Sequence, residues 1–270
     1  MNNENIIAAV KPADPLFSRN FSLTLRKEFI DNRKALLLGI VGILGFCITI
    51  GTILGFNYTG GTWGETSFYG FIALIIGCAV GSLTFSNLIH KETRISMLLV
   101  PDTMFDKFII RWFAVVPLLF ILLAIGLYFT EFSRIIVFKI VHSDEVVAAS
   151  GDFCKVLNPF ELIGMIHDPS GASLAANFLT FYLFSQSLYI LGSVLWPKLS
   201  FIKTFAAIWV LETIASIILM TIDINIPKGV IFDGTTFFWC VAAVTFAITV
   251  VVYVLAYLRF RNYQVVNKTF

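Results

Sequence analysis

Six stretches of this sequence are each long and apolar enough to cross a lipid bilayer, and they limit what the chain can fold into. The hydrocarbon core of a bilayer is about 30 Å thick, so a spanning α-helix needs about 20 mainly apolar residues. The stretches are Ala35–Phe56, Phe68–Ile89, Trp112–Phe129, Leu174–Leu195, Thr204–Ile222 and Phe237–Leu258. They are continuous and lack the apolar–polar alternation of lipid-facing strands. The sequence therefore predicts an all-α integral membrane protein with a six-helix transmembrane bundle over residues 35–258.

The composition supports this class and excludes others. Charged residues make up 13% of the chain, against about 25% in soluble domains. A net charge of +2, with no basic cluster interleaved with aromatics, argues against nucleic-acid binding. Three of the four cysteines (Cys47, Cys78 and Cys240) lie inside apolar stretches, where a thiol packs as a small hydrophobe. We therefore expect neither a disulfide nor a metal site built on cysteine.

Lysines and arginines predict the orientation, because cytoplasmic loops carry an excess of them. All but four of the 19 lie before the first stretch, after the last, or in the second-to-third and fourth-to-fifth connections. The four exceptions are Arg134, Lys139, Lys155 and Lys228. We therefore expect a multi-pass protein of the cell (inner) membrane, with residues 1–34 and the tail 259–270 in the cytoplasm.

The other side of the membrane would hold one large external loop, residues 131–173. It contains two apolar patches, Ile135–Val141 and Phe160–Ile166, which are too short to span a bilayer. We expect them to form helices that lie in the membrane interface.

An amphipathic helix is predicted before the first span. Asp14 and Pro15 are a typical helix start, with the aspartate as the cap and the proline at the first helical position. Four apolar side chains then recur every fourth residue, which places them on one face: Phe17, Phe21, Leu25 and Phe29. Such a helix rests in the headgroup region. It would act either as a simple anchor or as an elbow that transmits force to the spans.

The cytoplasmic connection between the second and third spans, residues 90–111, has a pattern of its own. Charged residues lead into an apolar run that a proline ends, and Asp102 or Thr103 can cap the helix that follows. The residues of this pattern are Lys91, Glu92, Arg94, Leu98, Leu99 and Pro101. A short amphipathic helix there would suit docking on a partner; the alternative is an ordinary connecting loop.

This pattern resembles the second-to-third loop of type-2 ABC exporter permeases, in which a coupling helix sits in a cleft of the ATPase subunit. The elbow helix, the six spans and the cytoplasmic termini are also features of that family. The resemblance implies a permease that forms the substrate pathway with a second permease, either an identical copy or a paralogue. It also implies a separate ATPase subunit that binds ATP and magnesium.

The chain itself is not expected to be an enzyme. It contains no G-x-x-x-x-G-K-[ST] phosphate loop, so ATP hydrolysis would belong to the partner. Its three histidines lack the H-E-x-x-H spacing of a zinc site. We expect no cofactor in this chain.

Glu212, near the middle of the fifth span, is costly at that depth, by about 3 kcal/mol. It should face the bundle interior, pair with a donor, or be protonated. Its role would be in the pathway or dimer interface, or in an internal hydrogen bond with Asn177, Ser185 or Gln186.

Two small-xxx-small pairs, Gly51 with Gly55 and Gly77 with Gly81, permit close helix contact. That contact would lie within one chain or between subunits.

Two other functions remain open. One is a non-transporting membrane scaffold, such as an immunity or sensor subunit. The other is an ion-coupled secondary transporter with Glu212 as the coupling carboxylate.

Overall fold

The computed structural model describes residues 21–56, 62–89, 92–93, 95, 103–141, 169–221 and 234–262, and every regular element in them is helical. The elements are α1 (Phe21–Asp31), α2 (Arg33–Phe56), α3 (Thr62–Leu83), the short 3-10 helix η2 (Ser86–Leu88), α5 (Met104–Val115), α6 (Pro117–Val141), α9 (Pro169–Leu195), α10 (Ser200–Thr221) and α11 (Gly234–Arg261). Six stretches of these helices are long and apolar enough to cross a membrane, and each overlaps one predicted span. The predicted all-α bundle of six spans is confirmed, and the chain is a multi-pass membrane protein by helix length and hydropathy.

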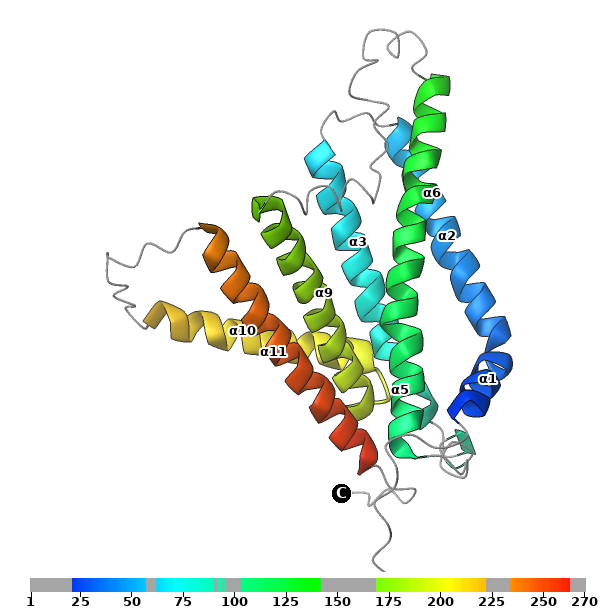
Figure 1. Cartoon of the computed structure of the whole chain (residues 1–270), viewed down its shortest axis with the longest axis vertical. Coiled ribbons are helices and arrows are strands. Elements are labelled where there is room, and N and C mark those ends of the chain that lie inside the picture. Colours follow the sequence, from blue (N-terminus) through cyan, green and yellow to red (C-terminus); the bar gives the residue numbers. More distant parts are fainter. Residues whose placement is uncertain are drawn as a thin grey trace, which may run out of the picture.

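The helices form two groups that meet at one end of the molecule (Figure 1). In one group α2 packs along α6; in the other α9 packs between α3 and α11. The helix α5 joins the groups, since it contacts both α6 and α11. The helix α10 runs across the second group, and its main contacts are with α9 and α3 (Figure 1). The second, fourth and sixth spans therefore pack together.

Glycines allow α2 and α6 to pack closely along a line of contact, here called the seam. A Cβ atom on Gly51 would collide with the Ser133 hydroxyl and the Thr130 carbonyl. A Cβ on Gly55 would lie 2.8 Å from the Arg134 carbonyl oxygen. This close approach lets the Ser133 hydroxyl donate a hydrogen bond to the Ile48 carbonyl, at 3.2 Å.

The seam between α3 and α9 is similar. A Cβ on Gly77 would lie 2.7 Å from the Tyr182 ring, and one on Gly81 3.3 Å from the Gln186 carbonyl. Both small-xxx-small pairs therefore pack within one chain, which was the first of the two alternatives.

The helix α6 begins at Pro117, directly after the turn at Val116 that ends α5. A proline has no N–H to donate to the preceding turn, which interrupts the helix there. The Gln186 side chain, 1% exposed, donates to the Val115 carbonyl at 3.1 Å across this break. A side chain of α9 thus satisfies a backbone carbonyl at the interruption between α5 and α6.

The same helix continues beyond the predicted third span, to Val141. Residues 131–141 of the segment predicted as an external loop are its last turns, so the separate interfacial helix expected at Ile135–Val141 is wrong. Two nitrogens of Arg134 donate to one Glu131 oxygen, at 2.8 and 3.1 Å, and this pair lets the helix continue through charged residues. The second patch, Phe160–Ile166, lies outside the described residues.

Candidate functional site

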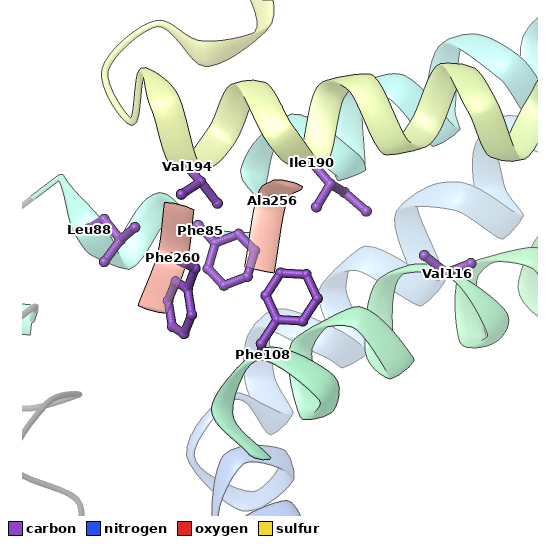
Figure 2. Close-up of a cluster of buried hydrophobic side chains, with 8 residues drawn as sticks. All are labelled: Phe85, Leu88, Phe108, Val116, Ile190, Val194, Ala256 and Phe260. Atoms are coloured by element: carbon purple, nitrogen blue, oxygen red, sulfur yellow. The ribbon is translucent and has the colours of Figure 1, made fainter. Parts of the chain in front are cut away.

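The candidate site lies at the end of the bundle that the sequence predicts to be cytoplasmic, and an aromatic core supports it. The Phe85 ring, just after α3, stacks on Phe108 of α5 at 5.6 Å between centroids. It also lies 4.9 Å from the Phe260 ring of α11. Figure 2 shows these rings packed beneath Ile190 and Val194 of α9. Four helices are therefore fixed to one another at this end.

The connection between the second and third spans starts from this core. After Phe85 the chain forms η2, and the Thr93 hydroxyl then donates to the Asn87 carbonyl at 2.6 Å. Glu92 and Thr93 are helical and exposed, and Ile95 is helical and half-buried. The turn that presents Glu92 is therefore tied to η2, the short helix that follows α3.

The structure describes one of the six predicted coupling residues. Glu92 is the one that is described. The others, Lys91, Arg94, Leu98, Leu99 and Pro101, lie outside the described residues.

The helix after the connection begins as predicted. Thr103 is the N-cap of α5, and its side chain accepts a hydrogen bond from the Asp106 amide at 3.1 Å. The backbone of Thr103 is extended, as expected for a capping residue. Of the two caps proposed from the sequence, the threonine is the one used.

The helix α1 is the described part of the predicted elbow. Phe21, Leu25 and Phe29 are half-buried, while Arg26 and Lys27 are exposed, so the apolar stripe and the basic face are separate as expected. Asn32 interrupts the helix before α2, and its side chain donates to the Glu28 carbonyl at 3.0 Å. The first residue of the stripe, Phe17, lies outside the described residues.

An ion pair joins the elbow to the third span. The Arg111 guanidinium of α5 donates to the Glu28 carboxylate of α1 at 3.4 Å. In the sequence Arg111 is one of many predicted cytoplasmic charges, and its pairing with Glu28 is not predicted. A signal was present, because Glu28 is three residues after Leu25 and therefore lies beside the apolar stripe on the helix surface.

Glu212 does not face the interior of the chain. Its side chain is exposed on α10, and within the described residues no hydrogen bond or ion pair to it occurs. Two of the three suggested partners are engaged elsewhere: Asn177 donates to the Ser173 and Phe238 carbonyls, and Gln186 donates to the Val115 carbonyl. The expectation of an interior hydrogen bond is therefore wrong, because α10 crosses the bundle and turns most of its surface outward.

Comparison of the chain with protein-family models, with curated proteins and with solved structures gives no match. Within the part of the chain that the structure describes, no group of three or more His, Cys, Asp or Glu side chains could hold a metal ion.

Proposed function

We propose that this chain is the permease subunit of an ATP-driven exporter, coupled to a separate ATPase subunit through its second-to-third connection. The observation that carries the proposal is the exposed helical turn at Glu92 and Thr93. Because the Thr93 hydroxyl ties this turn to Asn87 of η2, which directly follows Phe85, a displacement of the turn would be passed to the aromatic core. A loosely attached loop would absorb such a displacement.

The elbow helix supports the same function. It lies at the same end of the molecule as the connection (Figure 1), and its half-buried stripe and exposed basic face suit the headgroup region. In the proposed mechanism, ATP binding in the partner displaces the connection and the elbow together. The spans then shift between inward-facing and outward-facing arrangements.

Glu212 fits the proposed assembly of two permease chains. An exposed carboxylate at the depth of the bilayer core is costly against lipid. A second permease, identical or related, would cover the outer face of α10 and let Glu212 line a shared pathway. The same carboxylate also suits ion coupling, so transport driven by an ion gradient without ATP would favour a secondary transporter instead.

The test is purification of the tagged chain in mild detergent, with mass spectrometry of the proteins that accompany it. We expect a stoichiometric ATPase that is lost on Glu92→Lys. The matched control is Lys198→Glu, another charge reversal at an exposed residue, but in the other cytoplasmic connection. It should leave the complex intact.

Recovery of the chain without an ATPase, after crosslinking in the membrane as well, would contradict the proposal. It would favour the scaffold or the ion-coupled transporter. Loss of the ATPase in both variants would show that charge reversal in either cytoplasmic connection disrupts the complex, and that the Glu92 turn has no specific role.

A further inference from the structure

Arg111 makes two contacts of different kinds at the base of the bundle. Its Nη2 atom donates to the Glu28 carboxylate of α1 at 3.4 Å. Its guanidinium carbon also lies 5.7 Å from the centroid of the Phe85 ring, within the range of a cation–π contact. One side chain on α5 thus touches the elbow helix and the residue from which the second-to-third connection starts.

The two contacts differ in how far water reaches them. The Phe85 ring is fully buried and packed against Phe108 and Phe260, so its contact with the guanidinium is shielded from water. The Glu28 side chain is 37% exposed, and 3.4 Å is long for a charge-assisted hydrogen bond. The ion pair is therefore the more solvated of the two contacts.

The hydrogen-bonding capacity of the guanidinium is not filled. Its Nη1 atom is buried and has no hydrogen-bond partner among the described residues. Within the described residues the guanidinium is therefore held by the Glu28 ion pair and the Phe85 ring.

We propose that Arg111 is a positioning residue that couples the elbow helix to the start of the second-to-third connection. A displacement of α1 pulls the guanidinium through Glu28, and the guanidinium changes the packing of Phe85 at the end of α3. The idea deepens the proposed function and rests on it for its purpose. The contact itself belongs to this chain alone, so it is testable without an ATPase.

The test is amide hydrogen exchange, followed by mass spectrometry, on the purified chain in nanodiscs of zwitterionic and anionic phospholipid. Glu28→Gln should raise exchange by about threefold or more in α1. It should also raise exchange at residues 84–89, although no side chain there was changed. The matched control, Asp31→Asn, alters an exposed carboxylate on the same helix and should change neither region.

A second variant separates coupling from simple anchoring. Arg111→Lys keeps a cation near Glu28 but removes the planar group from the Phe85 ring. Exchange should then rise at residues 84–89 and change little in α1. If Glu28→Gln affects α1 alone or neither region, or if Arg111→Lys behaves as the wild type, Arg111 couples nothing and the inference is wrong. Failure to recover an ATPase would bear only on the proposed function.

Discussion

At the scale of single residues, the contact between α2 and α6 depends on the absence of a side chain at Gly51. The Cβ of an alanine there would meet a backbone carbonyl as well as the Ser133 hydroxyl, so the helices would have to separate. Gly51→Ala should destabilise the protein by about 1–3 kcal/mol. Gly45 of the same helix has nothing within 4 Å of its would-be Cβ, so Gly45→Ala should be neutral or stabilising by up to about 1 kcal/mol.

Thermal unfolding of both variants in one detergent, followed by intrinsic fluorescence, measures the difference. Equal melting temperatures would show that the seam can relax, and that the close approach of Gly51 is not required.

The buried ion pair of α6 makes a second prediction at this scale. Glu131 is 0% exposed and Arg134 is 6% exposed. Arg134→Leu should cost about 3–5 kcal/mol, because it leaves a buried carboxylate without its cation. The double variant Glu131→Leu with Arg134→Leu should recover most of that stability, since apolar replacement of a buried pair is often neutral. A double variant as unstable as the single one would mean that Arg134 stabilises the helix through other contacts.

Single residues were also where the sequence was least informative. The sequence predicts Arg134 to lie in an external loop, because a loop charge and a buried, paired charge look alike in one sequence. For Glu212 the sequence leaves both an interior hydrogen bond and a pathway or dimer interface open, because the cost of a carboxylate at membrane depth shows that it needs cover but not which surface provides it. The Thr103 cap could be foreseen, because a cap depends on residues adjacent in the chain.

At the scale of elements, the Thr103 N-cap is predicted to stabilise the start of α5, the first helix of the third span. Thr103→Ala removes the acceptor of the Asp106 amide and should cost about 1 kcal/mol, whereas Thr103→Ser should retain the cap. Hydrogen exchange of the Asp106 amide should rise about fivefold in the alanine variant and stay near wild type in the serine variant. Equal exchange in the two variants would contradict a capping role for the side chain.

Element lengths and element packing differ in how well the sequence predicts them. The six spans follow from the thickness of the bilayer and overlap the observed helices. The end of α6 was missed because residues 135–141 are as apolar as a short interfacial helix would be. The crossing of α10 over α9 and α3 depends on contacts between distant segments, which periodicity along one helix does not encode.

At the scale of the whole molecule, the exposure of α10 bears on the proposed pair of permeases. Phe205, Trp209, Glu212 and Ser216 recur at helical spacing and are all exposed. A face of this kind, with a carboxylate within it, is poorly suited to lipid. A second copy of the chain that packs along this face would cover it and place two Glu212 side chains beside one pathway.

Oxidative crosslinking in native membranes tests this arrangement in a chain whose four cysteines are replaced by alanine. Ser216→Cys lies one turn from Glu212 on the same face, and we expect it to give a disulfide-linked species of twice the 30.2 kDa of the chain. Ile214→Cys is also exposed but points to the opposite side of α10, since two residues correspond to about 200° of helical rotation. It should crosslink far less. Equal crosslinking at the two positions would indicate random collision, and its absence at both would contradict a homodimer packed on this face.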